Sequence, residues 1–370
     1  MTRGIRVVFR ADASLDIGTG HVMRCLTLAQ ALQAQDAECL FLCREHPGHL
    51  LDVVRNRGFE ARSLPLHDPT AAISYEDEPS HASWLGTDWR TDADDVIAAL
   101  EDATIDWLVV DHYALDRRWD SALRPFCKQL LVIDDLADRE HDCDVLLDQN
   151  LGRLISDYSG LVPPHARVLA GPMHALLRQD FLVSRDISLT RRHTSSAIRH
   201  ILISMGGVDQ PNATARTLTA LQQTDLPADC RITVVLGPHA PWRTDILARA
   251  ASMKWPTEVL INVADMGSLM AASDLAVGAA GTTSWERCCL GLPALIVVLA
   301  DNQKDAARAL EREGAAIALK RFPDTAFDIE LEAAMHELIS APEKLMAMSK
   351  AASSVTDGQG ADRLASSMVV

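Results

Sequence analysis

Short apolar runs alternate with helical patterns along the whole chain. The first run, at residues 5–10, is followed by a loop, and then the apolar residues of 21–35 recur at helical spacing. Later runs rich in apolar and β-branched residues are separated in the same way by polar or amphipathic stretches. Such alternation is typical of parallel sheets whose strands are joined by crossover helices, so the pattern predicts an α/β fold.

The alternation is interrupted once, at residues 184–196, where Arg, Thr and Ser predominate without periodicity. It resumes at Ile198, so we expect two doubly wound, Rossmann-like domains, at residues 1–190 and 191–370. Two such domains that face each other form a cleft, a common place for small-molecule sites. The small and polar residues of 353–370 give little indication of a terminal helix that returns to the first domain.

Composition and charge narrow the function classes. The chain has 370 residues, of which 48% are hydrophobic and 23% charged, which excludes a disordered or fibrous protein. The 51 acidic and 35 basic side chains give a net charge of −16, which disfavours nucleic acid and anionic membranes as partners. The basic residues 191–193 fit a solvated linker, and the absence of a leader or apolar span predicts a cytoplasmic protein. The eight cysteines include no CxxC pair, so we expect neither disulfides nor zinc.

The loop after the first strand carries the first candidate site: Asp12, Gly18, Gly20 and His21. It lacks the third small residue of a dinucleotide fingerprint and the lysine of a P-loop. A glycine turn lets a ligand approach closely, and the helix N-terminus disfavours a protonated imidazole, which suits His21 to act as a general base. Asp12 is then expected to orient the imidazole or to stabilise the cation that forms when it takes the proton. The alternative is that His21 is a capping or core residue.

Acidic residues follow two further predicted strands. Asp111, His112 and Tyr113 follow residues 107–110, and Asp134 and Asp135 follow 130–133. Open α/β sheets place ligands at the carboxyl ends of their strands. Adjacent carboxylates point in different directions, so we expect neither a two-carboxylate glycosidase nor a metal site here.

Glycine turns recur in the second half, where backbone N–H groups at helix starts are expected to bind phosphate. One turn contains Gly206 and Gly207. The sharper signal, directly after the strand at 275–277, is formed by Gly281, Thr282, Thr283 and Ser284, and it predicts a diphosphate site.

Two polar groups adjoin that signal. Glu286 could accept hydrogen bonds from ribose hydroxyls, or it could cap its helix, and the sequence leaves these alternatives even. Asn302 and Gln303 follow the strand at 294–298, where their amides suit sugar hydroxyl or acetamido groups, with helix capping as the alternative.

Together these motifs resemble the nucleotide-sugar hydrolases of pseudaminic acid biosynthesis, the PseG type. The most specific match is the opening run from residue 10 to residue 29. Further matches span nearly the whole chain, at residues 84–86 with Trp89, 110–113, 133–139, 141–144, 147–150, 204–207 and 281–286. The motifs of the second half are shared in outline with MurG-like glycosyltransferases.

The resemblance implies a GT-B architecture and the hydrolysis of UDP-2,4-diacetamido-2,4,6-trideoxy-β-L-altropyranose to UDP and the free sugar, with neither metal nor cofactor. It places the catalytic histidine at His21 and the sugar-site tyrosine and asparagine at Tyr113 and Asn302. By similarity to the MurG-like second domain, Glu286 would hold the ribose, and backbone groups around Met266 would bind uracil.

One position departs from the resemblance, because Ala280 stands where relatives usually have glycine and adds a methyl group near the expected phosphates. Two other functions remain open, namely a MurG-like UDP-sugar glycosyltransferase and a nucleotide-sugar-binding module without catalysis. The sequence does not fix the stereoisomer of the sugar or the oligomeric state.

Overall fold

The computed structural model describes residues 4–67, 78–101, 105–194, 197–238, 240–320 and 322–369. The chain forms two compact units. The first comprises Met1–Leu176 and Gln359–Val370, and the second comprises Leu177–Gly358. The sequence predicted a first domain that ends at residue 190, whereas the second unit begins at Leu177. The last residues of the chain, Gln359–Val370, belong to the first unit.

The first unit is built on a seven-stranded sheet in the order β3-β2-β1-β4-β5-β6-β7, and every strand pair is parallel. The strands are β1 (Arg6–Ala11), β2 (Glu38–Arg44), β3 (Glu60–Leu64), β4 (Ile105–Asp111), β5 (Cys127–Ile133), β6 (Val145–Asp148) and β7 (Arg167–Ala170). The helices are α1 (Gly20–Gln33), α2 (Leu51–Asn56), α3 (Trp89–Leu100), α4 (Arg117–Leu123) and α13 (Gly360–Val369). The strand order reverses between β1 and β4, which makes that position the topological switch point.

Both faces of this sheet are buried, which explains its nearly continuous apolar strands. Phe9 of β1 and Val109 of β4 pack into a core that also contains apolar residues of α1 and α13. Their neighbours Val8 and Leu108 pack into a second core around Trp119 of α4. Because successive side chains of a strand point to opposite faces, each strand contributes to both cores.

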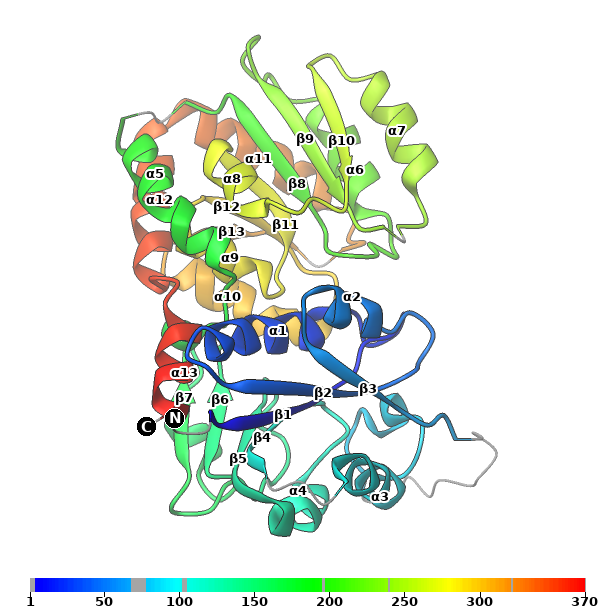
Figure 1. The fold of residues 1–370 in the computed structure, drawn as a ribbon. Coiled ribbons are helices and arrows are strands. Elements are labelled where there is room, and N and C mark those ends of the chain that lie inside the picture. The colour runs from blue at the N-terminus through cyan, green and yellow to red at the C-terminus, as the bar shows by residue number, and fades with distance from the viewer. Residues whose placement is uncertain are drawn as a thin grey trace. The chain divides into compact units, whose positions relative to one another are not determined.

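The second unit has a six-stranded parallel sheet in the order β10-β9-β8-β11-β12-β13, with its switch point between β8 and β11 (Figure 1). The strands are β8 (His200–Ser204), β9 (Arg231–Leu236), β10 (Thr257–Ile261), β11 (Leu275–Ala279), β12 (Ala294–Val297) and β13 (Ala316–Ala318). The helices are α5 (Gln179–Thr194), α6 (Ala213–Leu221), α7 (Arg243–Ala251), α8 (Met266–Ala272), α9 (Thr283–Cys289), α10 (Lys304–Arg312), α11 (Phe327–Ser340) and α12 (Pro342–Val355).

Helix α5 corrects the prediction of an irregular linker at residues 184–196 as far as Thr194, and residues 195 and 196 lie outside the described residues. Its Arg192 is buried rather than solvated, and its guanidinium donates to three backbone carbonyls, those of Met270, Ser273 and Leu290. Contacts to the rest of the unit thus stabilise the helix, and hydrophobic periodicity does not record such contacts.

Helix α13 returns to the first unit and packs against α1 (Figure 1). Leu364 and Met368 enter the same core as α1, and Trp107 Nε1 donates to the carbonyl of Met368 at 3.0 Å. Among the helices that the structure describes, none has the length and apolar character needed to cross a membrane.

Candidate active site

The loop between β1 and α1 places His21 in the first helical turn. The loop is closed by Gly18, whose N–H donates to the carbonyl of Ser14 at 2.9 Å, while the Ser14 hydroxyl accepts from Ile17 N at the same distance. Gly18 has a φ of +80°, which favours glycine whatever space surrounds it. Gly20 is exposed, and a Cβ added there would meet no atom within 4 Å, so the approach to the helix start is open.

His21 forms a buried pair with Asp111, the last residue of β4. His21 Nδ1 lies 2.6 Å from Asp111 Oδ1, and the residues are 7% and 0% exposed. Burial would raise the pKa of Asp111, but Arg24 and His21 hold it well below its usual value. The ionised carboxylate can only accept, so Nδ1 carries a proton, and in the neutral imidazole Nε2 then keeps its lone pair. No described residue hydrogen-bonds Nε2, and the imidazole can therefore accept a proton from a substrate or water.

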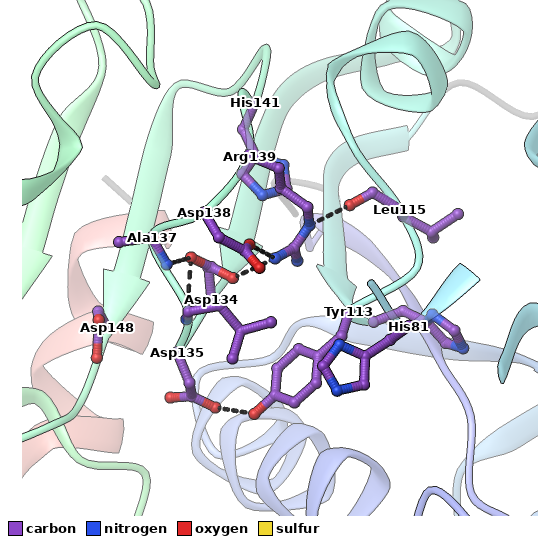
Figure 2. Close-up of polar contacts among 12 residues, drawn as sticks. His81, Tyr113, Leu115, Asp134, Asp135, Ala137, Asp138, Arg139, His141 and Asp148 are labelled. Atoms are coloured by element: carbon purple, nitrogen blue, oxygen red, sulfur yellow. Dashed lines mark hydrogen bonds and ion pairs between the residues drawn. The ribbon is translucent and has the colours of Figure 1, made fainter. Parts of the chain in front are cut away.

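Arg24, one turn along α1 from His21, links the ends of two strands. Its Nε and Nη2 donate to the two oxygens of Asp111 at 2.6 and 2.7 Å, and its Nη1 donates to Asp135 Oδ2 at 2.6 Å. The hydroxyl of Tyr113 donates to the same oxygen at 2.6 Å (Figure 2). Burial and the nearby Asp135 raise the pKa of Tyr113, so its phenol stays protonated. The arrangement fixes His21 and Tyr113 relative to each other at the carboxyl edge of the sheet.

Aromatic rings gather beside this histidine. The rings of Tyr113 and His21 meet edge to face with their centroids 4.6 Å apart, and Trp84 stacks on Tyr113 at 5.9 Å. His81 contacts both Trp84 and Tyr113, and Figure 2 shows it beside the tyrosine. All three rings are half-buried, so they offer partly accessible apolar faces next to the candidate base.

Asp12 does not orient His21, contrary to the prediction from sequence. It is fully buried, and its carboxylate accepts from Arg10 Nη2 at 2.8 Å and from Arg44 N at 2.7 Å. Burial opposes ionisation, but Arg10 and the neighbouring His112 and His46 keep the pKa of Asp12 well below its usual value. Asp12 is therefore part of an internal ion-pair network, and Asp111 of β4 takes the predicted position beside the imidazole.

Asp134 and Asp135 point to different partners, as expected for adjacent residues. Asp134 accepts from Ala137 N at 2.8 Å and pairs with Arg139 at 2.9 Å, and Arg139 Nε donates to the carbonyl of Leu115 (Figure 2). Asp134 thus orders the loop after β5, whereas Asp135 belongs to the His21 network.

The second unit has two predicted phosphate sites, and at one of them the backbone N–H groups of the helix start are already hydrogen-bonded within the protein. The N–H groups of Ala213 and Thr214 at the start of α6 donate to the carboxylate of Asp209, and Ala215 N donates to Asn212 Oδ1. The first turn of α6 is thus already capped, which corrects the expectation of unshielded donors there. Gly206 and Gly207 are exposed at the end of β8.

The loop between β11 and α9 keeps more of its donors. Gly281 and Thr282 are exposed, Thr283 is half-buried, and neither threonine hydroxyl is engaged by a described residue. Ser284 differs, because it is buried and its hydroxyl accepts from Arg287 Nη2 at 3.0 Å. Ala280 is buried and lies outside the left-handed φ region, so its methyl group introduces no backbone strain.

Glu286 lies half-buried in α9, and its carboxylate has no hydrogen-bond partner among the described residues. Burial raises its pKa to about 7, against the attraction of Arg178. Arg178 Nη1 also donates to the carbonyl of Ala264 at 3.3 Å, and Asp180 accepts from Gly267 N at 3.3 Å. Glu286 and the turn before Met266 thus share the neighbours Arg178 and Asp180, which the sequence analysis did not single out.

The last two predicted residues lie in the turn Asp301–Gln303 after β12. Gln303 uses its side-chain oxygen to accept from Leu299 N at 3.0 Å, which leaves its amide nitrogen for a ligand. The side chain of Asn302 lies outside what the structure describes. Among the described residues, no group of three or more His, Cys, Asp or Glu side chains could hold a metal ion.

Sequence reasoning missed the roles of Asp111, Arg24 and Asp135. Two of them were visible as acidic residues at strand ends, and Arg24 stands one helical turn after His21. Which carboxylate meets the imidazole depends on the strand order, because β4 lies beside β1 although 90 positions along the chain separate His21 from Asp111. Periodicity does not specify that neighbour.

Comparisons with known proteins agree with this architecture. Residues 212–364 match the glycosyltransferase family 28 C-terminal domain. An uncharacterized protein of Methanocaldococcus jannaschii is 22% identical over 303 residues, which are 81% of this chain and 56% of the relative. A Campylobacter jejuni protein named UDP-2,4-diacetamido-2,4,6-trideoxy-beta-L-altropyranose hydrolase is 25% identical over 222 residues, which are 60% of this chain and 68% of the relative. The chain thus spans less than two thirds of the archaeal relative's length.

Among solved structures, MurG of Acinetobacter baumannii superimposes with a TM-score of 0.71 over 99% of both chains, at 15% sequence identity. With its two parallel doubly wound sheets, the chain has a GT-B fold.

Proposed function

We propose that this protein hydrolyses UDP-2,4-diacetamido-2,4,6-trideoxy-β-L-altropyranose to UDP and the free sugar, as a step of pseudaminic acid biosynthesis. The observation that carries the proposal is the His21–Asp111 pair at the switch point of the first sheet, where Nε2 of His21 has no partner among the described residues. The similarity to the Campylobacter protein of that name supports the choice of substrate.

In the proposed reaction, His21 Nε2 removes a proton from a water molecule as the water oxygen attacks C1 of the sugar. The bond between C1 and the diphosphate oxygen breaks, UDP leaves with that electron pair, and the configuration at C1 inverts. Asp111 stabilises the imidazolium that forms, and the proton then passes to solvent. Neither a metal nor a cofactor takes part in this scheme.

The nucleotide is assigned to the second unit. Gly281, Thr282 and Thr283 offer the donors for the diphosphate, and Glu286 accepts from the ribose hydroxyls. The backbone around Met266 is assigned to uracil. The sugar is assigned to Tyr113, and the aromatic faces beside His21 suit the apolar edge of a deoxy sugar. Asn302 and Gln303 of the second unit stay candidates for sugar hydroxyl or acetamido groups.

The test is hydrolysis of this substrate in ¹⁸O-labelled water without metal or acceptor, followed by anomeric-proton NMR and mass spectrometry. We expect ¹⁸O in the sugar with wild-type protein and loss of turnover in His21→Ala. His165→Ala, which changes an exposed histidine of the same unit, serves as the control and should retain full activity. Label in UDP would contradict attack at C1.

The alternative is a MurG-like UDP-sugar glycosyltransferase, which the fold and the matching C-terminal domain favour equally. A glycosyltransferase would release UDP at an appreciable rate only when an acceptor is present. A binding module without catalysis would bind the substrate and leave it intact, and His21→Ala would then change nothing.

A further inference from the structure

A buried arginine lies beneath the loop to which the diphosphate is assigned. Arg287 of α9 is 3% exposed, and its Nη2 donates to the carbonyl of Ala279 at 2.7 Å and to Ser284 Oγ at 3.0 Å. One guanidinium nitrogen therefore holds both ends of the turn between β11 and α9.

Arg287 forms no ion pair with a described residue, and the neighbouring Glu286 attracts its charge only from beyond contact distance. No described carboxylate lies within ion-pair distance, and Nε has no hydrogen-bond partner. Buried charges are normally paired, as Arg10 and Arg24 of the first unit are with aspartates. Burial lowers the pKa of Arg287 to about 10, which still leaves it charged at neutral pH.

A second buried arginine of the same unit differs from Arg287, because all of its guanidinium nitrogens have acceptors. Arg192 of α5 also lacks a carboxylate partner, but its Nε, Nη1 and Nη2 all donate to backbone carbonyls. Arg192 is thus satisfied by the fold, whereas Nε and Nη1 of Arg287 have no described acceptor.

The open edge of Arg287 lies at the switch point of the second sheet. A Cβ built on Gly278 would lie 2.5 Å from Arg287 Nη1 and 2.4 Å from the carbonyl oxygen of Ser204. Gly278 of β11 pairs with Ser204 of β8, and the strand order reverses between these two strands. Doubly wound sheets bind ligands at this point, outside the carboxyl ends of the strands.

We propose that Arg287 is a positioning residue for the diphosphate of the nucleotide. Its positive charge lies beneath residues 278–284 and attracts the phosphates that bind above them. This inference rests on the proposed function, because it requires a nucleoside diphosphate at this loop. It adds a buried charge to a site otherwise built from backbone and hydroxyl donors.

The test compares UDP with uridine by titration calorimetry, because uridine lacks the phosphates. We expect Arg287→Met to weaken UDP binding about tenfold or more, as for loss of a charge-assisted contact, and to leave uridine binding within about twofold. Arg287→Lys should keep most of the UDP affinity, since it keeps the charge. Arg192→Met should reduce stability without changing either affinity.

The outcomes separate this inference from the proposed function. If Arg287→Met weakens the binding of UDP and uridine equally, or weakens neither, the role of Arg287 is overturned. Turnover by the wild-type protein would still support the proposed function in that case. Wild-type protein that binds neither ligand would overturn both. If circular dichroism shows that Arg287→Met is unfolded, Arg287→Gln, which retains a donor for Ala279, takes its place with the same expected selectivity.

Discussion

At the scale of single residues, the two aspartates at adjacent strand ends have different partners for a physical reason. Asp12 follows β1 and meets Arg10 of the same strand, so its charge is compensated within the core. Asp111 ends β4 and faces α1, which brings His21 and Arg24 to it. The arginine keeps Asp111 ionised, and only an ionised carboxylate fixes the imidazole with Nε2 free to accept a proton.

Asp111→Asn should lower the hydrolysis rate by about 10²- to 10⁴-fold, the range typical for loss of an oriented general base. The amide cannot compensate the charge of the imidazolium, although the fold around it is retained. The measurement is kcat with the UDP-sugar, accompanied by UDP affinity, which should not change.

A matched control is available in the same unit. Asp120 is also fully buried and pairs with a histidine, His141, at 2.9 Å. Asp120→Asn should cost stability but leave kcat of the folded protein near the wild-type value. Equal loss of rate in both variants would mean that Asp111 acts only through folding.

Glu286→Gln should stabilise the ligand-free protein more at pH 8 than at pH 5. Burial raises the pKa of Glu286 from an ordinary value near 4.5 to about 7 in the folded state. Between these values the folded state holds a proton that the unfolded state has released, so stability falls as pH rises through this window and is constant above it. Glutamine removes this dependence. Urea unfolding at both pH values measures the difference, and a gain independent of pH would contradict the assignment.

At the scale of elements, strands were predicted more closely than helices and loops. Residues 107–110 and 130–133 were predicted as strands and lie within β4 and β5. Buried strands of a parallel sheet are continuous apolar runs, which a sequence displays directly. Helix α5 was missed because most of its buried residues are polar, namely Ser184, Ser188 and Arg192, and polar residues carry no hydrophobic period.

Two glycines, Gly278 of β11 and Gly281 of the loop after it, should respond differently to alanine. Gly278→Ala places a Cβ 2.4 Å from the backbone oxygen of Ser204, so we expect a loss of about 1–3 kcal/mol in unfolding free energy. Gly281→Ala meets no atom within 4 Å and should change stability by less than about 0.5 kcal/mol. Urea unfolding measures both. A tolerated Gly278→Ala would show that the β8–β11 edge can open, against the close approach described above.

At the scale of the whole molecule, the sequence predicted the fold class and the doubling of the sheet but not the path of the chain between the units. The GT-B fold was expected from the resemblance and agrees with the solved structures. The division at Leu176 and Leu177 was not expected, because it falls before a helix whose polar residues imitate a linker. The candidate site divided in the same way. Candidate residues beside glycine turns could be predicted from the sequence. The contacts of Asp111 with His21 and Arg24 could not, because they depend on the strand order.

The return of α13 to the first unit leads to a prediction at this scale. Leu364 is 1% exposed and packs in the core that contains α1, so Leu364→Ala should cost about 2–4 kcal/mol in unfolding free energy. Hydrogen exchange followed by mass spectrometry can locate the loss. Peptides from α1 and β4 should exchange faster, while peptides from α6 and β9 of the second unit keep the wild-type rate. Ser367→Ala, on the exposed face of the same helix, should leave both sets unchanged. This localisation is expected because a helix that packs in one core destabilises only the elements of that core when its contacts are lost. Faster exchange in the second unit would contradict it and would mean that α13 stabilises both units.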